Sequence, residues 1–168
     1  MDIVIREYRE ADREALRDCM EKLQDYIVSV DPLKRVRRAP EFGEEYTKWL
    51  LELIHGKNGI IYFAYLRGQT EKEGKVIGCC AGIMSPQAPH DVAAVVPSKH
   101  GRVQELYVDS KYRGEGVGKA LMEKIEEYFR KNGCDTVMLE VFAPNKSAYA
   151  FYQSCGYLDR DINMMKKL

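Results

Sequence analysis

The residues with the clearest chemical potential form a glycine-rich segment in the second half of the chain. Residues 106–121 read LYVDSKYRGEGVGKAL, in which an apolar run is followed by Gly114, Gly116 and Gly118 and then by a helical pattern. The start of a helix presents unpaired backbone N–H groups and a partial positive charge, which together bind phosphate. Because glycine has no Cβ, a phosphate group can approach the backbone closely. The segment therefore predicts a phosphate-binding loop between a strand and a helix.

The spacing of the glycines distinguishes three kinds of phosphate loop. A P-loop requires G-x-x-x-x-G-K-S/T, but Arg113 occupies the first glycine position and Ala120 the hydroxyl position. A dinucleotide loop requires G-x-G-x-x-G, and Lys119 occupies its third glycine position. The pattern that fits is Q/R-x-x-G-x-G/A, with Arg113, Gly116 and Gly118. A tight turn that binds no ligand is the alternative interpretation of the same glycines.

A second segment favours the phosphate-loop interpretation over the tight turn. After the expected helix, residues 136–142 form a strand-like run, and Asn145, the pair Phe151-Tyr152 and the pair Gly156-Tyr157 follow. Together the two segments, from residue 103 to residue 157, resemble the GNAT superfamily of acyl-CoA-dependent N-acetyltransferases. The resemblance implies an enzyme that moves an acetyl group from acetyl-CoA directly to a primary amine. A catalytically inert sensor that binds acyl-CoA is the alternative function, because such a sensor would bind the same cofactor without turnover.

The resemblance also implies which residues contact the cofactor. The backbone N–H groups of the loop would hold the pyrophosphate of acetyl-CoA, and the strand before the loop would pair with the pantetheine arm. Asn145 would bond the arm, although an asparagine at that position is also a good helix N-cap. Alternatively, the charged side chains of the loop are exposed to solvent and contact no cofactor. The expected cofactor-binding residues are Leu106, Tyr107, Val108, Arg113, Gly114, Glu115, Gly116, Val117, Gly118, Lys119 and Asn145.

Three residues are candidates for the proton transfers. The resemblance implies that Tyr152 returns a proton to the departing thiolate, a role that suits a neutral phenol. Glu105 precedes the loop on its strand, and Glu140 lies in a Leu-Glu-Val sequence, so either carboxylate is a candidate base for the amine. Each also has a structural alternative: Tyr152 as a packed aromatic residue and the glutamates as solvent-facing strand residues. An enzyme without a dedicated base remains a further alternative.

Composition sets the remaining expectations. The 168 residues suit a single acetyltransferase domain, 1–168, and the 26 basic and 26 acidic residues provide no net charge to attract nucleic acid. The early residues Asp2, Arg6 and Glu7 interrupt any apolar leader, and the longest apolar runs are too short to span a bilayer, so we expect a cytoplasmic protein without a membrane partner. Five cysteines without C-x-x-C spacing indicate free thiols and no metal. The expected partner is a small-molecule or peptide amine, and a homodimer is an open alternative.

The elements that must position these residues follow from periodicity. The order β-α-α-β-β-β-α-β-α-β predicts an α/β (α+β) fold in which helices flank a mixed, mostly antiparallel central sheet, as the GNAT resemblance implies. The expected strands are residues 3–8, 60–66, 76–84, 103–108, 136–142 and 157–166, and the expected helices begin near residues 11, 46, 116 and 145. Residues 71–74 are expected to join two strands as a hairpin, and residues 85–101 to form a loop.

A basic cluster lies between the first two expected helices. It consists of Lys34, Arg35, Arg37 and Arg38. An acidic acceptor or the ribose phosphate of the cofactor are ligands with complementary charge, and a solvated loop is the alternative that needs no ligand.

Overall fold

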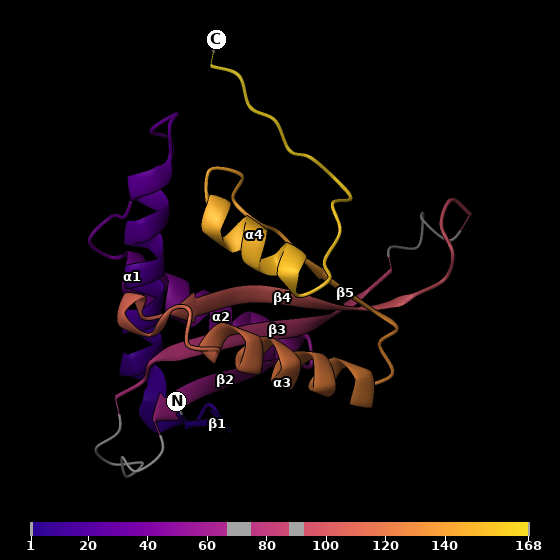
Figure 1. Ribbon diagram of the computed structural model, residues 1–168, viewed down its shortest axis with the longest axis horizontal. Helices are drawn as coiled ribbons and strands as arrows, with labels where there is room; N and C mark the ends of the chain where they lie inside the picture. The colour runs from indigo at the N-terminus through magenta and orange to yellow at the C-terminus, as the bar shows by residue number, and fades with distance from the viewer. Residues whose placement is uncertain (1, 67–74, 88–92, 168) are drawn as a thin grey trace.

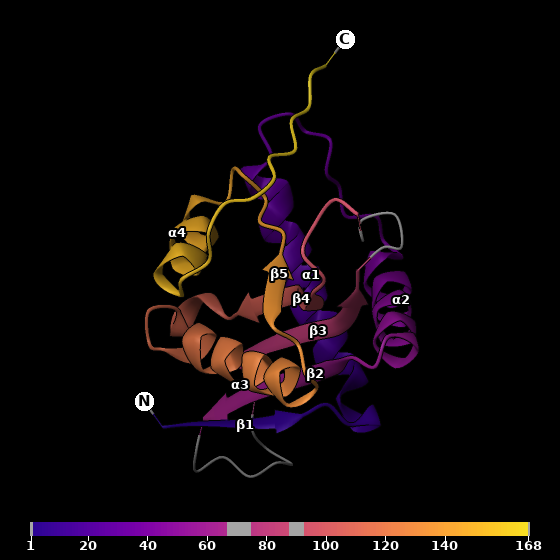
Figure 2. The same ribbon diagram turned by 90° about the vertical axis from the view of Figure 1, so that its right-hand side faces the viewer.

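A five-stranded sheet forms the centre of the protein (Figures 1 and 2). The computed structural model describes residues 2–66, 75–87 and 93–167. The strands lie in chain order, and each pairs antiparallel with the next except for the parallel pair β4 and β5. The strands are β1 Ile3–Glu7, β2 Ile60–Leu66, β3 Gly78–Pro86, β4 Lys99–Val108 and β5 Thr136–Leu139.

Helices cover both faces of the sheet. Figure 2 shows α2 and α3 on opposite sides of it, and the side-chain clusters place α1 with α2 and α4 with α3. One short 3-10 turn precedes α1 and another follows β4. The helices are α1 Arg13–Val30, α2 Phe42–Gly56, α3 Val117–Lys131 and α4 Lys146–Ser154, and the 3-10 turns are η1 Glu10–Asp12 and η3 Ser110–Tyr112.

The sequence of β2 shows why the sheet lies between two layers. Its run IIYFAYL is apolar at every position because both of its faces are covered. Phe63 and Tyr65 pack against the α1 and α2 layer, whereas Tyr62 and Ala64 pack against the α3 layer. Alternate side chains of β2 thus belong to two hydrophobic cores, one on each side of the sheet.

The predicted fold class is confirmed: a mixed, mostly antiparallel sheet with helices on both faces. The order of elements also agrees as far as α4. The loop expected over residues 85–101 is shorter than predicted, because β3 continues to Pro86 and β4 begins at Lys99, and these two residues pair. Proline is tolerated at the end of a strand, where no further ladder bond is needed. The hairpin expected at residues 71–74 lies outside the described residues.

The other differences are at the C-terminal end. β5 stops at Leu139 and not at residue 142, and the strand expected over residues 157–166 does not form. That segment is extended and leaves the body of the protein after α4, as the yellow end of the trace in Figure 1 shows. Leu158, Ile162, Met164 and Met165 are exposed along it.

Across the described part of the chain, none of the helices combines the length and apolar character needed to cross a membrane.

Candidate active site

The glycine loop has the backbone geometry of an open helix N-terminus. After β4, the Asp109 side chain accepts a hydrogen bond from the backbone N–H of Lys111 at 3.0 Å and so caps η3. Gly114 and Gly116 then adopt positive φ angles of 81° and 85°, a region that favours glycine. α3 begins directly afterwards, and its first helical bond runs from the N–H of Ala120 to the carbonyl of Gly116. The backbone N–H groups of residues 117–119 therefore precede the helical bonding pattern, as phosphate binding requires.

The three glycines of the loop are needed for different structural reasons. A Cβ at Gly114 or Gly116 would meet no atom within 4 Å, so these positions need glycine for their φ angles and leave open space above the backbone. A Cβ at Gly118 would lie 3.2 Å from the Phe151 ring and 3.7 Å from the Val108 side chain. Gly118 therefore lets α4 pack closely against the start of α3.

The two basic side chains of the loop, Arg113 and Lys119, lie differently. The Nε of Arg113 donates a hydrogen bond to the carbonyl of Val108 at 3.1 Å, and its guanidinium lies over the ring of Tyr26, 5.1 Å from the centroid. Such a cation–π contact orients the guanidinium beside the loop. Lys119 faces solvent and approaches Glu123 at 3.9 Å on the surface of α3.

β4 pairs with β5 over only part of the length of β4. His100 to Val103 of β4 pair with the four residues of β5, and β4 then continues to Val108 without β5 beside it. Residues 106–108, expected to contact the cofactor arm, lie on this extension, directly before the glycine loop. The separation of the strands leaves an edge of β4 beyond its last β5 pair, which is the feature that backbone pairing with an extended ligand arm needs.

An irregularity in β4 determines where Glu105 points. Ala81 of β3 pairs with Glu105, and the next residue, Gly82, pairs with Val103, so Gln104 forms a bulge. A bulge shifts the alternation of side chains by one residue. Val103 accordingly packs with the α3 core, whereas the Glu105 side chain meets α2 on the opposite face.

Glu105 is partly buried, and among the described residues Tyr46 donates a hydrogen bond to its side chain. The hydroxyl of Tyr46 on α2 donates a hydrogen bond to the Glu105 carboxylate, and the Tyr46 ring itself packs between Phe42 and Trp49, with ring centroids 5.0 Å away in each case. Burial raises the pKa of Glu105 to about 7, and the hydrogen bond from Tyr46 partly opposes this rise. A carboxyl group with this pKa exchanges protons near neutral pH.

Glu140 lies in a different environment. Its side chain is 83% exposed and pairs with Arg102, with a distance of 2.6 Å between Arg102 Nη2 and Glu140 Oε1. Such an exposed ion pair is typical of a strand-end surface. The structure therefore does not bring Glu105 and Glu140 into one enclosed site.

Tyr152 lies on α4 among aromatic side chains. Its ring centroid is 5.4 Å from that of Phe151 and 6.0 Å from that of Tyr157. Burial is the main reason that its pKa is raised, and electrostatic interaction with Glu105 adds to the rise. The hydroxyl of Tyr152 makes no hydrogen bond with any residue that the structure describes. Tyr152 therefore presents a neutral phenol, free to donate a hydrogen bond, within electrostatic range of Glu105.

Asn145 caps α4 and also contacts α1. Its Oδ1 accepts hydrogen bonds from the N–H of Ala148 at 3.2 Å, from Ser147 Oγ at 3.0 Å and from the hydroxyl of Tyr26 at 3.3 Å. Tyr26 is a residue that sequence reasoning missed, because its spacing on α1 indicated only an apolar helix face. In the structure Tyr26 links Asn145 to Arg113, which are two of the expected cofactor-binding residues.

The basic cluster between α1 and α2, made of Lys34, Arg35, Arg37 and Arg38, forms an ordered turn. The carboxylate of Asp31 accepts hydrogen bonds from the backbone N–H groups of Leu33, Arg35 and Val36, and Arg38 pairs with Asp25. The turn is exposed and lies at the end of α1, after Tyr26.

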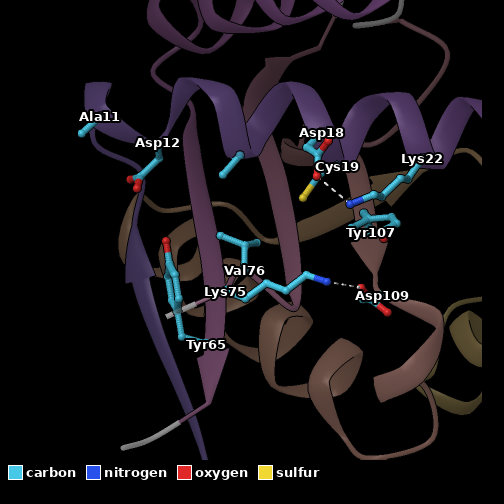
Figure 3. Close-up of a pocket in the computed structure, with 11 residues that line it drawn as sticks. Ala11, Asp12, Asp18, Cys19, Lys22, Tyr65, Lys75, Val76, Tyr107 and Asp109 are labelled. Atoms are coloured by element: carbon cyan, nitrogen blue, oxygen red, sulfur yellow. Dashed lines mark hydrogen bonds and ion pairs between the residues drawn. The ribbon is translucent and has the colours of Figure 1, made fainter. Parts of the chain in front are cut away.

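A cavity of about 270 Å³ lies between α1 and the sheet (Figure 3). Figure 3 shows Lys22 directed toward Asp18 and Lys75 toward Asp109, with distances of 2.6 Å and 3.7 Å between the charged atoms. Both lysines that line this cavity thus already have acidic partners. Neither Glu105 nor Tyr152 lines it, so the cavity is separate from the candidate catalytic residues.

Comparisons with known proteins find relatives among N-acetyltransferases. The chain is 30% identical over 120 residues to an uncharacterized N-acetyltransferase of Methanocaldococcus jannaschii, covering 70% of this chain and 46% of that protein. It is 34% identical over 68 residues to glucosamine 6-phosphate N-acetyltransferase of Arabidopsis thaliana, covering 40% of this chain and 44% of that protein. The chain thus spans about half the length of these relatives.

A solved structure shares the fold over nearly the whole chain. The tetramutant of the BH1408 protein from Bacillus halodurans superposes with a TM-score of 0.77 at 20% identity, covering 98% of this chain and 99% of that one. Residues 16–157, which include the glycine loop, Glu105 and Tyr152, match the acetyltransferase (GNAT) family. The chain belongs to the GNAT family of acetyltransferases.

Proposed function

We propose that this protein is an N-acetyltransferase that moves an acetyl group from acetyl-CoA to a primary amine by direct transfer. The observation that carries the proposal is the position of Glu105. Its carboxyl group has a pKa of about 7 and lies on β4 two residues beyond the last β5 pair, directly before the strand segment 106–108. A base is most effective when its pKa is close to the working pH, and at pH 7 a substantial fraction of Glu105 is ionised.

The glycine loop and the edge of β4 suit acetyl-CoA. The backbone N–H groups of residues 117–119 would bind the pyrophosphate, and the absence of a Cβ at Gly114 and Gly116 leaves the approach to this backbone open. Residues 106–108 would bind the pantetheine arm through their backbone. Once bound there, acetyl-CoA supplies the acetyl group as a thioester.

Glu105 would act as the proton acceptor for the amine, directly or through one water molecule. An amine attacks a thioester only in its neutral form, so its proton must leave before or during formation of the nitrogen–carbon bond. Tyr46 orients the carboxylate through its hydrogen bond. Glu140 is the weaker candidate, because it is exposed and its carboxylate already pairs with Arg102.

Tyr152 would act as the proton donor. When the carbon–sulfur bond breaks, the electron pair remains on sulfur, and the hydroxyl of Tyr152 would supply a proton or a strong hydrogen bond to that thiolate. The raised pKa keeps the phenol protonated at neutral pH, and its hydroxyl has no competing partner among the described residues. Asn145 and Arg113 would support the cofactor side of the site, with Tyr26 between them.

The acceptor belongs to the class of primary amines, either of a small molecule or of a peptide. The Arabidopsis relative is named for glucosamine 6-phosphate, a small amine that carries a phosphate. The exposed basic residues Lys34, Arg35 and Arg37 are a feature of this chain to which an anionic acceptor would be attracted. An acceptor without a negative charge would leave this turn as a solvated surface.

Release of free coenzyme A thiol from acetyl-CoA, followed with a panel of amines, tests the proposal. The panel should contain amino sugars with and without phosphate, polyamines, amino acids and short peptides with free N-termini. Turnover with at least one amine, reduced strongly in Glu105→Gln and little in Glu140→Gln, is the expected result. Acetyl-CoA binding by calorimetry without turnover on any amine would instead favour the inert acyl-CoA sensor.

A further inference from the structure

Three aromatic side chains lie along one flank of α2. The residues that α2 buries are Gly43, Thr47 and Leu50. One residue before each of these comes an aromatic residue, so Phe42, Tyr46 and Trp49 form a second stripe beside the buried face. The exposure of this aromatic stripe increases along the helix: Phe42 and Tyr46 are half-buried, whereas Trp49 is 44% exposed.

The three rings contact one another and reach the candidate base. The ring centroids of Phe42 and Tyr46 are 5.0 Å apart with an interplanar angle of 18°, and those of Tyr46 and Trp49 are 5.0 Å apart with an angle of 43°. Tyr46, the middle ring, donates its hydroxyl hydrogen to the Glu105 carboxylate. The aromatic stripe is therefore turned toward β4, and Trp49 lies one ring away from the residue that contacts Glu105.

Core packing does not account for Trp49. Phe42 and Tyr46 pack against the buried cluster beneath α1 and α2, but Trp49 is not among the described residues that do so. The indole N–H of Trp49 also makes no hydrogen bond with any residue that the structure describes. A large apolar ring that is open to water beside an ionisable group suits a ligand whose body packs on the ring while a polar group of the ligand meets the charge.

The polar groups of the aromatic stripe are too few for a ligand with many hydroxyl groups. Phe42 has none, and the hydroxyl of Tyr46 is already bonded to Glu105, so only the indole N–H of Trp49 is free among the three. A sugar placed against these rings would leave most of its hydroxyl groups without a partner on the stripe. An aromatic ring needs no such partners and stacks directly on an indole.

We propose that the acceptor is a primary amine joined by a short chain to an aromatic ring, which stacks on Trp49 while the amine lies at Glu105. This inference rests on the proposed function, because it names the class of acceptor for the same site. The ring of the acceptor would extend the aromatic stripe by one member. Before it loses its proton, the ammonium group would also be attracted to the Glu105 carboxylate and to the face of Tyr46.

Rates with three amines test this acceptor class. Release of coenzyme A thiol is measured with phenylethylamine, with ethylamine, which lacks the ring, and with glucosamine. We expect kcat/KM for phenylethylamine to exceed that for each of the other two by about 10–100-fold, mainly through KM. Trp49→Ala should remove most of this preference and Trp49→Phe should restore part of it. Val4→Ala, which shortens a 39% exposed side chain on β1, is the control and should keep the parental preference.

Fluorescence gives a second measurement that needs no turnover. Trp49 is the one tryptophan of the chain, so its emission reports directly on the proposed contact. We expect phenylethylamine to change the emission and ethylamine to leave it unchanged. Should no amine be acetylated, the proposed function fails, and an absent emission change would then overturn this inference as well, whereas a change with phenylethylamine alone would still support the ring contact.

Other results would overturn the inference while the N-acetyltransferase function stands. These are turnover without preference for phenylethylamine, a preference that persists in Trp49→Ala, and a preference for glucosamine.

Discussion

The hydroxyl of Tyr46 on α2 donates a hydrogen bond to the carboxylate of Glu105 on β4, across the interface between the two layers. This contact has two effects on one group. It fixes the direction of the carboxylate, and it stabilises the ionised form against the burial that otherwise raises its pKa. Aromatic packing of Tyr46 against Phe42 and Trp49 holds the donor in place.

Replacing Glu105 with glutamine should remove the base while preserving size and hydrogen-bonding capacity. We expect kcat/KM to fall by about 10²–10⁴-fold, and the acidic limb of its pH profile, placed near pH 7 by the pKa of Glu105, to disappear. Glu140→Gln is the matched control, because that side chain is exposed, and we expect an almost unchanged profile. Parental profiles in both variants would mean that the amine loses its proton without a protein base.

Tyr46→Phe should shift the same limb without removing it. The hydrogen bond from Tyr46 favours the carboxylate, so its loss raises the pKa of Glu105. We therefore expect the acidic limb of kcat/KM to move to higher pH, with a smaller loss of rate at high pH than at neutral pH. A limb that stays in place, measured on a variant with a parental thermal melt, would separate Tyr46 from the titrating group.

The raised pKa of Glu105 also predicts how stability depends on pH. Folding raises this pKa from an ordinary value of 4.5 to about 7, so the folded state retains a proton that the unfolded state loses, and Glu105 destabilises the fold progressively as pH rises through this window. Glu105→Gln should therefore stabilise the protein by about 1–3 kcal/mol more near pH 8 than near pH 5. Denaturant titrations of parent and variant at both pH values measure this difference, and a pH-independent difference would contradict it.

The glycine loop could be predicted from the sequence, whereas the orientation and contacts of the residues around it could not. Gly114, Gly116 and the start of α3 follow from local chemistry, because positive φ angles and a helix start leave a recognisable pattern of glycines. The direction of the Glu105 side chain depends on the bulge at Gln104. The residue types of Val103, Gln104 and Glu105 do not predict such a bulge. Its contact with Tyr46 joins residues far apart in the chain, and such pairings arise only once α2 packs on the sheet.

The ends of strands were the least predictable part of the fold. Residues 140–142 and 157–166 have strand-like composition, but composition alone does not provide a neighbouring strand. β5 stops where it leaves β4, and the C-terminal segment has no partner strand within the described part of the chain. The contacts of Tyr26 with Arg113 and Asn145 were also not predicted. A tyrosine at helical spacing indicates only an apolar helix face, and the partner of its hydroxyl is known only from the structure.

Gly116→Ala tests the cofactor loop with an internal control for backbone strain. Gly116 and Gly133 both have positive φ angles, 85° and 76°, and a Cβ at either position meets no atom within 4 Å. Alanine should therefore cost a similar stability at both, about 1–2 kcal/mol, but only Gly116 precedes the N–H groups of α3. We expect acetyl-CoA affinity, measured by calorimetry, to fall in Gly116→Ala and to persist in Gly133→Ala. Equal affinities would place the phosphates elsewhere. Gly118 is a less clean site, because a side chain there also presses on Phe151.

Tyr152→Phe tests the proton donor. The variant keeps the ring that packs against Phe151 and Tyr157, so the fold and the acetyl-CoA affinity should survive, and only the hydroxyl is lost. If that hydroxyl protonates the departing thiolate, the loss appears in kcat when chemistry limits the rate, and we expect about a 10²–10⁴-fold reduction.

Tyr149→Phe is the control on the same helix, because its hydroxyl bonds Asp159 and not the cofactor side, so kcat should stay parental. An acetyl donor with a better leaving thiol, which needs less help from a proton donor, should restore part of the rate in Tyr152→Phe. A folded Tyr152→Phe variant with parental kcat under rate-limiting chemistry would remove this residue from the mechanism and leave solvent as the source of the proton.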